Sequence, residues 1–292
     1  MRIGGSTLIK LLLFASVMIY SLSGCHQLPN NGVPVYLHID SATVLYNPAF
    51  GSASHNIPDV WVTSGATTIG AFQTPVDIPI LAGGNVPIAV SAGIYDNGIV
   101  NTPVQYPFYA PDTFTIYHAI PGHVYHHKPA YYYYAFTQVG LNADFESVNP
   151  FTNMSIMTNQ ADSNVFEGLK SGGIILSSTA DSLTALQTVP VVINTNGRQA
   201  YVELNYRINN PNTFLDVGII ATLYSGGQIS EQTYYDKILL TPLGYWNKTY
   251  LNFNNEIGGN ANYSFQIYLT GYHTPGQQDT VFVDNVKLLY FH

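Results

Sequence analysis

The stretch Gln199-Ala200-Tyr201-Val202-Glu203-Leu204-Asn205-Tyr206-Arg207 decides the fold, because apolar and polar side chains alternate along it. Successive side chains of a β-strand point to opposite faces of a sheet, so a period of two predicts a strand. The two faces would carry Val202, Leu204 and Tyr206 on one side, and Glu203, Asn205 and Arg207 on the other.

Similar strand-like runs follow one another along most of the chain. Residues 263–269 alternate in the same way, residues 214–224 are almost continuously apolar, and residues 59–70 form two short runs around Ser64-Gly65. Turn residues separate such runs roughly every ten positions, and no stretch carries a convincing apolar stripe at helical spacing. The pattern predicts an all-β chain, and a length of 292 residues favours two β-sandwich domains.

Charge is scarce in this chain and excludes several classes of protein. Only 9% of the residues are charged, nine basic and 17 acidic, against about a quarter in an average protein. Nine scattered cations cannot form the basic face that a nucleic-acid partner needs. The single cysteine excludes an internal disulfide and a thiolate metal cluster, and the richness in aromatic residues argues against disorder.

The first 25 residues read as an export signal. Arg2 and Lys10 flank a short polar start, and the apolar run 11–20 has the length of a signal-peptide core but is too short to span a membrane. The run ends in Leu22-Ser23-Gly24-Cys25, which resembles the lipobox of bacterial lipoproteins. The resemblance implies cleavage before Cys25, acylation of Cys25 by palmitate-type chains and, with His26 rather than Asp next, an outer-membrane location. Whether the protein faces the periplasm or the outside stays open.

We therefore divide the chain into a signal peptide (1–24), a lipidated tether (25–34), a small β-sandwich (35–140) and a jelly-roll β-sandwich (141–292). The spacing of valines, isoleucines and glycines in 60–93 resembles PEGA-type and carboxypeptidase-regulatory-type modules, which carry no chemistry of their own. A wider stretch that includes 93–99 and 106–111 resembles outer-membrane lipoproteins of Bacteroidetes-type bacteria, which implies a location. Pro79 and Pro87 predict edge strands, since proline cannot donate to a ladder.

The second domain resembles the jelly-roll carbohydrate-binding modules. The resemblance rests on Asp144-Phe145-Glu146 at its start, Trp246 before a late strand and Val283-Asp284-Asn285-Val286 in the closing strand. It implies a structural calcium ion held by Glu146 and Asp284, with backbone carbonyls as further ligands. The alternative is an Asp that caps a turn and a solvated Glu. Candidate residues for stacking on a sugar are Tyr234, Tyr245 and Trp246, although a lone Trp in a sandwich is commonly a core residue.

Two further clusters are candidates for function. His118, His123, His126 and His127 could hold a transition metal, but neighbouring side chains of a strand diverge, so a solvated hairpin is the favoured interpretation. The run 131–134 consists of four tyrosines. In a strand, alternate rings of this run would face inward, and we expect them to pack between the domains.

Motifs of catalysis are missing from the sequence. It contains no HExxH, GxSxG, P-loop or GxGxxG pattern, so we expect a protein that is not an enzyme. The leading hypothesis is a membrane-anchored lipoprotein whose jelly roll binds glycan or another extracellular polymer. One alternative is a structural or accessory subunit of an outer-membrane complex for nutrient uptake, secretion or motility. A second is a glycoside hydrolase or lyase with two facing carboxylates.

Overall fold

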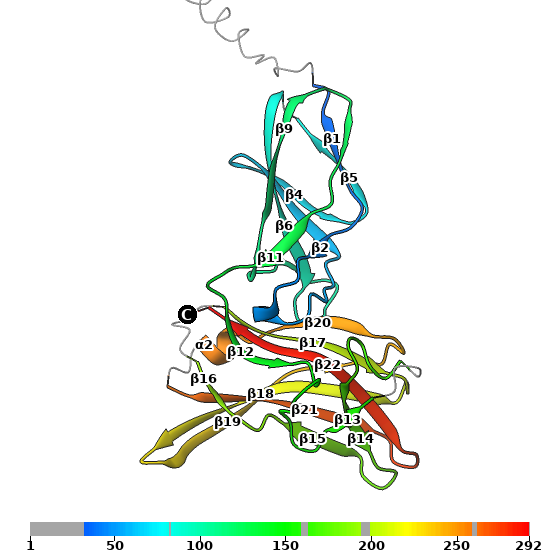
Figure 1. Cartoon of the computed structure of the whole chain (residues 1–292), viewed down its shortest axis with the longest axis vertical. Coiled ribbons are helices and arrows are strands. Elements are labelled where there is room, and N and C mark those ends of the chain that lie inside the picture. The colour runs from blue at the N-terminus through cyan, green and yellow to red at the C-terminus, as the bar shows by residue number, and fades with distance from the viewer. Residues whose placement is uncertain (1–31, 82, 159–162, 194–198, 259–261, 292) are drawn as a thin grey trace, which may run out of the picture.

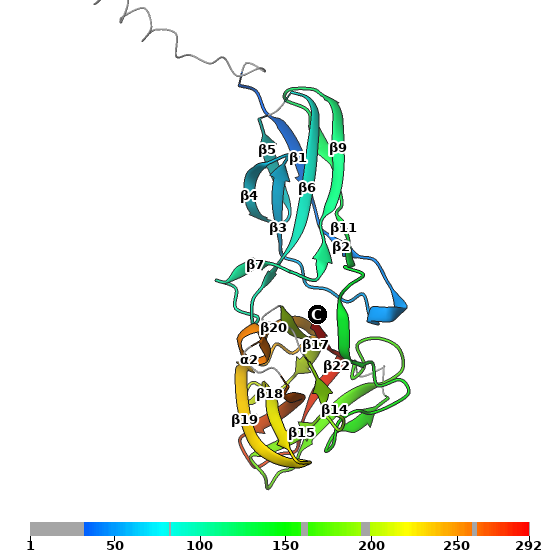
Figure 2. The same cartoon turned by 90° about the vertical axis from the view of Figure 1, so that its left-hand side faces the viewer.

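The computed structural model describes residues 32–81, 83–158, 163–193, 199–258 and 262–291. The predicted signal peptide and Cys25 lie outside the described residues, so the lipidation stays a prediction. No helix among the described residues is long and apolar enough to cross a membrane. The chain forms two strand-built domains stacked end to end (Figure 1, Figure 2), and the prediction of an all-β fold of sandwiches is confirmed.

The first domain contains three sheets. The main sheet has the order β4-β3-β6-β7 with β9 also paired to β6, and two smaller sheets have the orders β10-β1-β5 and β2-β11-β8. Its elements are β1 (Val35–Ile39), β2 (Thr43–Val44), the 3-10 helix η1 (Pro48–Phe50), β3 (Asp59–Ser64), β4 (Thr67–Gln73), β5 (Val76–Ile80), β6 (Gly84–Tyr95), β7 (Pro103–Gln105), β8 (Tyr109–Ala110), β9 (Asp112–Ala119), β10 (Val124–His126) and β11 (Ala130–Tyr133). Its core lies between the main sheet and the sheet of β1 and β5.

The expectation that Pro87 lies in an edge strand is wrong, for a local reason. β6 is a central strand, paired with β3 on one side and β9 on the other. However, β3 ends at Ser64, opposite Ile88, and the carbonyl of Pro87 accepts from Gly65 in the turn beyond. The N–H and C=O of one residue point to the same side of a strand, so the missing donor of Pro87 faces that turn rather than a ladder. Pro79 does lie in an edge strand, β5.

The second domain is a sandwich of two sheets, which we call the inner sheet and the outer sheet. The inner sheet has the order β13-β14-β22-β17-β20 with β12 also on β22, and the outer sheet has the order β15-β21-β18-β19 with β16 also on β21. The elements are β12 (Gln138–Ala143), β13 (Ser155–Met157), β14 (Ser171–Leu176), β15 (Ser182–Leu186), β16 (Val191–Val192), β17 (Ala200–Ile208), β18 (Thr213–Ser225), β19 (Gln228–Leu240), β20 (Asn247–Asn252), α2 (Asn254–Gly258), β21 (Ser264–His273) and β22 (Asp279–Tyr290). β12 begins three residues before the predicted boundary at 141.

The inner sheet is covered on both faces. Val202, Leu204 and Tyr206 of β17 point into the core against the outer sheet, as their spacing predicts. The opposite face of the inner sheet packs on the first domain through a second cluster, which includes Tyr201 and Leu289. The layers are therefore first domain, inner sheet and outer sheet, and the outer sheet lies farthest from the first domain (Figure 1).

Tyrosines from the first domain fill the junction between the two domains. Tyr131 and Tyr133 of β11 are buried there, whereas Tyr132 between them is half exposed. The prediction that alternate rings of the 131–134 run pack between the domains is confirmed. A buried tyrosine hydroxyl usually has a polar partner, and for Tyr133 that partner is the carboxylate of Glu203, at 3.0 and 3.1 Å.

Glu203 is the centre of a buried cluster of charges at the junction. Its Oε2 lies 2.8 Å from Lys248 Nζ and 4.0 Å from Lys287 Nζ, and all three side chains are at most 2% exposed. Tyr106 of the first domain also donates to Glu203, and Lys287 donates to the carbonyl of Ser52 at 2.6 Å. Three strands of the second domain and three segments of the first, those of Ser52, Tyr106 and Tyr133, thus share one polar network.

Candidate functional site

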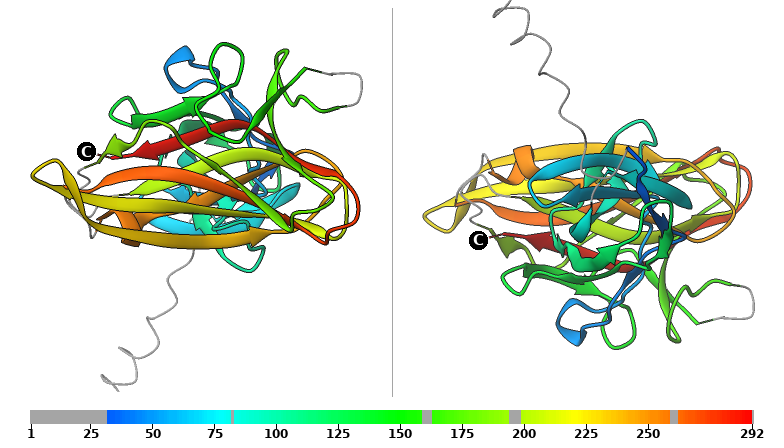
Figure 3. Two further views of the ribbon diagram at one scale, coloured as in Figure 1. Left: turned by 90° about the horizontal axis from the view of Figure 1, so that it is seen from below. Right: turned by 90° about the horizontal axis from the view of Figure 1, so that it is seen from above.

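The outward face of the outer sheet, which we call the outer face, combines aromatic and acidic side chains. Leu215, Val217, Ile219 and Ala221 of β18 point into the core, so the alternate positions of β18 and their partners on β19 and β21 point away from it. The outer face comprises Phe214, Asp216, Gly218, Ile220, Thr222, Gln232, Tyr234, Asp236, Leu239, Ser264, Gln266, Tyr268, Thr270 and Tyr272. Figure 3 (left) views the molecule from this end, where β18, β19 and β21 cross the picture.

Tyr268 lies across β18 above Gly218. A Cβ on Gly218 would stand 2.2 Å from the Cζ and hydroxyl oxygen of Tyr268, so only glycine leaves room for the ring. The Tyr268 hydroxyl then reaches the next strand and donates to Asp236. The ladder between β18 and β19 shifts register beside Gly218, where Lys237 is the extra residue on β19. Such a bulge re-aims side chains, and here Asp236 faces Tyr268.

Two aspartates give the outer face a negative charge. Burial raises the pKa of Asp216 to about 6, and the nearby charge of Asp236 contributes to the shift. Burial, followed by the charges of Asp216 and Asp236, also raises the pKa of Tyr272. None of the described outward-facing positions on β15, β18, β19 and β21 is Lys or Arg. An anionic ligand would therefore meet repulsion without a compensating cation.

Exposed rings flank the aspartates. Tyr234 is 62% exposed and Tyr272 is 41% exposed. The rings of Tyr234 and Tyr268 lie 6.2 Å apart at an angle of 53°, so the two do not form a coplanar platform. Ring faces and a few fixed polar groups are the usual lining of small-molecule sites. The outer face can stack against apolar ring surfaces of a ligand while its carboxylates and amides accept hydrogen bonds from hydroxyl groups.

The three aromatic residues singled out from the sequence are not brought together. Tyr234 lies on the outer face. Trp246 directly precedes β20 of the inner sheet and donates its Nε1 hydrogen to the carbonyl of Ser163 at 2.8 Å. Tyr245 is 61% exposed and lines a hollow of about 290 Å³ between the two domains. Sequence reasoning did not identify Asp216, Asp236 or Tyr268.

Glu146 and Asp284 lie on either side of the loop 166–170. Glu146 Oε1 accepts from the amides of Leu169 and Lys170 at 2.7 and 2.9 Å. Both oxygens of Asp284 also accept backbone N–H groups, and burial raises its pKa to about 7.

The arrangement around these two carboxylates does not fit a calcium ion. The Lys170 ammonium donates to the backbone carbonyl of Glu146 at 2.6 Å, which places a positive charge where a cation would need oxygen ligands. Within the described part of the chain, no three His, Cys, Asp or Glu side chains form a metal-binding group.

The histidines expected in a hairpin are separated. β10 pairs with β1 rather than with β9. His118 lies near the end of β9, and His123 directly precedes β10. The His126 ring lies 4.7 Å from that of His38, and His127 Nε2 lies 2.9 Å from Asp112 Oδ2.

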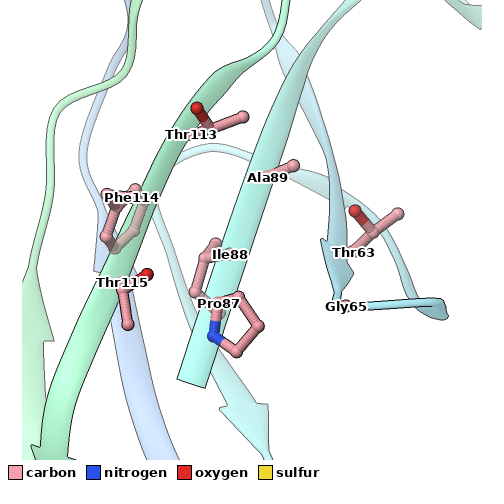
Figure 4. Close-up of a pocket in the computed structure, with 8 residues that line it drawn as sticks. All are labelled: Thr63, Gly65, Pro87, Ile88, Ala89, Thr113, Phe114 and Thr115. Atoms are coloured by element: carbon pink, nitrogen blue, oxygen red, sulfur yellow. The ribbon is translucent and has the colours of Figure 1, made fainter. Parts of the chain in front are cut away.

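Another hollow, of about 330 Å³, lies on the main sheet of the first domain (Figure 4). Its lining consists of Thr63, Gly65, Pro87, Ile88, Ala89, Thr113, Phe114 and Thr115. Small side chains and three hydroxyl groups dominate this lining, and it contains no ionisable group. The outer face therefore offers more charged and hydrogen-bonding groups for recognition of a ligand than this hollow does.

Comparisons with known proteins return distant structural likenesses. No family model and no curated protein matches the chain. A family 11 carbohydrate-binding module from Clostridium thermocellum, solved with a β-1,3-1,4-mixed-linked tetrasaccharide, is similar at 13% identity and TM-score 0.36 over 52% of this chain and 94% of that chain. A family 22 xylan-binding domain from Paenibacillus barcinonensis is similar at 12% identity and TM-score 0.35, over 53% and 95%. At these values the likeness assigns neither a family nor a ligand to this chain.

Proposed function

We propose that this protein is a lipid-anchored, non-catalytic glycan-binding protein of a bacterial outer membrane, and that the outer face binds the glycan. The lipobox-like Leu22-Ser23-Gly24-Cys25 supports the anchor. One observation carries the binding function: the outer face combines exposed Tyr234 and Tyr272 with the carboxylates of Asp216 and Asp236.

The charge of the outer face narrows the class of ligand. Asp216 and Asp236 accept hydrogen bonds from hydroxyl or ammonium groups and repel carboxylates, sulfates and phosphates. The ligand is therefore a neutral or amino-bearing glycan rather than a uronate or sulfated polymer. The outer face also lies at the opposite end of the molecule from the residues that lead to Cys25 (Figure 1), so an anchored protein would present it away from the membrane.

A binding screen with the chain from residue 26 onward tests this proposal. The probes are neutral glucans, xylans and mannans, chitosan oligosaccharides, and polygalacturonate as an acidic control, on an array and then by calorimetry. We expect binding to a neutral or amino-bearing glycan and none to polygalacturonate. Absence of binding to every neutral and amino-bearing glycan by correctly folded protein would end the glycan proposal.

Matched variants locate the site. Tyr234→Ala and Asp216→Asn should each weaken binding about tenfold or more, because aromatic anchors and buried polar contacts dominate recognition. Tyr245→Ala removes an equally exposed tyrosine from outside the outer face and should leave affinity unchanged. Equal losses in all three variants would place the glycan elsewhere. Release of reducing ends from a bound glycan, abolished by Asp216→Asn, would instead favour the hydrolase.

An accessory role in an outer-membrane complex is the second candidate, and an edge strand favours it. Among the strands that the structure describes, β19 is paired only with β18, and it exposes Ile229 and Leu239. An open edge with apolar side chains is a template for pairing with another chain. Purification from detergent-solubilised membranes tests this role, since recovery of the chain without a stoichiometric partner would count against it.

A further inference from the structure

The end of the first domain that lies away from the junction exposes a cluster of apolar side chains, which we call the tip. Leu81, Tyr117 and Ile120 are each more than 60% exposed, and Val33 and Val124 are 44% and 40% exposed. Exposed turns of soluble domains usually carry polar residues. Grouped apolar side chains on a surface indicate a contact with something other than water.

Three segments distant in sequence converge to form the tip. Val35 at the start of β1 pairs with Ile80 at the end of β5, and the amide of Gly122 donates to the carbonyl of Pro34 at 2.8 Å. Gly84 of β6 pairs with Ala119 of β9. The start of β1 and the ends of β5 and β9 consequently lie together at one end of the molecule (Figure 1).

The tip carries no formal charge apart from its histidines. Residues 33–37, 78–81, 83–86 and 114–126 contain no Asp, Glu, Lys or Arg. The nearest charged residues, such as Asp40, Asp77 and Asp112, lie toward the opposite ends of the same strands. The ionisable side chains of the tip are the tyrosines and histidines, including His118 and His123. Such a surface has no carboxylate, ammonium or guanidinium group to desolvate when it approaches a low-dielectric layer.

The tip is also where the chain enters the fold from the predicted anchor. Eight residue steps separate Cys25 from Val33, which span at most about 29 Å when fully extended. An irregular tether of this length averages about 16 Å. A surface held this close has an effective concentration in the millimolar range, so even a weak affinity keeps it in contact.

We propose that the tip lies against the surface of the lipid bilayer that holds Cys25, with Leu81, Tyr117 and Ile120 at the level of the lipid headgroups. This inference rests on the lipid anchor of the proposed function. Tyrosine is favoured at such an interface because its ring is apolar and its hydroxyl is polar. The anchor and the tip then form two membrane contacts, and the molecule stands upright with the outer face directed outward.

Site-specific fluorescence on vesicles tests the proposal. A polarity-sensitive fluorophore is attached at Ile120→Cys, and in a second protein at Tyr245→Cys, which starts from the same 61% exposure. The lipidated protein is placed on phosphatidylcholine vesicles with and without nitroxide-labelled lipid. We expect a blue shift and quenching by the nitroxide at position 120 and neither effect at position 245. A label at 120 that stays in water, or that is shielded without quenching, would overturn the membrane contact.

A second attachment separates the tip from the anchor. In Cys25→Ala chains that begin at residue 25, an N-terminal histidine tag binds nickel-chelating lipid in the same vesicles. Quenching at position 120 in these chains supports the contact between the tip and the bilayer, even if Cys25 proves not to be acylated. Absence of quenching contradicts that contact, even if Cys25 is acylated. The double substitution Leu81→Glu and Ile120→Glu, read from a label at Tyr117→Cys, should abolish the quenching while thermal unfolding of the first domain is preserved.

Discussion

The hydroxyl of Tyr133 lies 3.0 and 3.1 Å from the two carboxylate oxygens of Glu203, although 70 residues separate them in the sequence. Tyr133 belongs to the first domain and Glu203 to the inner sheet of the second, so this contact crosses the junction. If the domains rotated, the buried carboxylate of Glu203 would lose its hydrogen bonds from Tyr106 and Tyr133, and such a loss is costly in a low-dielectric site. The network therefore fixes one orientation, in which the tip and the outer face stay at opposite ends.

Removal of the charge of Glu203 should destabilise the whole chain. Glu203→Gln leaves Lys248 and Lys287 buried without their counter-ion, and breaking a buried ion pair from one side costs about 3 to 5 kcal/mol. We expect urea unfolding at a much lower denaturant concentration. Glu203→Gln combined with Lys248→Met should recover part of the loss, because the unpaired charge is also removed. Unfolding of the single variant at the wild-type urea concentration would contradict this role.

The stabilising effect of Glu203 should depend on pH. Burial by itself raises the pKa of Glu203, but the charges of Lys248 and Lys287, with the hydrogen bonds, hold it below the usual 4.5. A depressed folded-state pKa means that the contribution is present above pH 4.5 and is lost as the pH falls through the lower folded-state value. The stability difference between wild type and Glu203→Gln should therefore shrink on acidification.

The sequence predicted the strands well and their burial less well. Alternation placed Val202, Leu204 and Tyr206 on the core face of β17, and they lie there. The polar face of the same stretch carries Glu203 and Asn205, which are also buried, at 0% and 1% exposure. A period of two separates the faces of a strand, but it does not say that a second domain will cover the polar one. Burial of the polar face of β17 depends on the packing of the first domain against it, and the two domains are distant in sequence.

Gly218→Ala should displace Tyr268 from its position on the outer face. The new methyl group would stand 2.2 Å from the Tyr268 ring and 2.5 Å from the carbonyl oxygen of Tyr235. Tyr268 must then leave Asp236, and overpacking of this kind costs about 1 to 3 kcal/mol. Gly271→Ala on the adjacent strand meets side-chain atoms at 3.3 to 3.4 Å and serves as the milder control. The temperature of thermal unfolding and the affinity for glycan should both fall more in Gly218→Ala than in Gly271→Ala. Equal losses in the two variants would contradict the packing of Tyr268 over Gly218.

The candidate site was harder to predict than the fold. Asp216 is the one acidic residue within the almost continuously apolar run 214–224, and that interruption was the available signal. Asp236 and Tyr268 carried no signal, because their meeting depends on the order β21-β18-β19 and on a bulge. The sequence indicates Tyr234 as a candidate for stacking but not the residues around it, whereas Trp246 and Tyr245 lie outside the outer face.

Asp216→Asn should stabilise the protein near neutral pH. The carboxyl titrates near 3.8 when exposed, and burial raises its pKa to about 6 in the folded chain. Between these values the folded state holds more protons than the unfolded state, so stability falls as the pH rises from about 4 to 6. Above pH 6 the free-energy cost of burying the charged Asp216 carboxylate is fully present, and an uncharged Asn removes that cost. The variant should melt higher than wild type at pH 7.5 and similarly at pH 4, and a pH-independent difference would contradict the assignment.

Removal of divalent metal should leave the second domain as stable as before. Oε1 of Glu146 and both carboxylate oxygens of Asp284 already accept backbone N–H groups, and Lys170 supplies the local positive charge. Thermal unfolding should therefore not change on addition of EDTA or of excess calcium. A ligand bound only by the native state stabilises it, so a lower melting temperature in EDTA, restored by calcium, would establish the calcium site.

Cys25→Ala should release the protein from membranes. The thiol is the acceptor of the predicted acyl chains, and stable anchoring needs more than one chain or a second membrane contact. Without acylation, the tip is left with a weak, reversible interaction, and most of the protein should move to the soluble fraction as an uncleaved or unlipidated form. Radiolabelled palmitate should label the wild type and not the variant. If washed membranes retained Cys25→Ala as well as the wild type, and neither protein carried palmitate, something other than lipid on Cys25 would hold the chain.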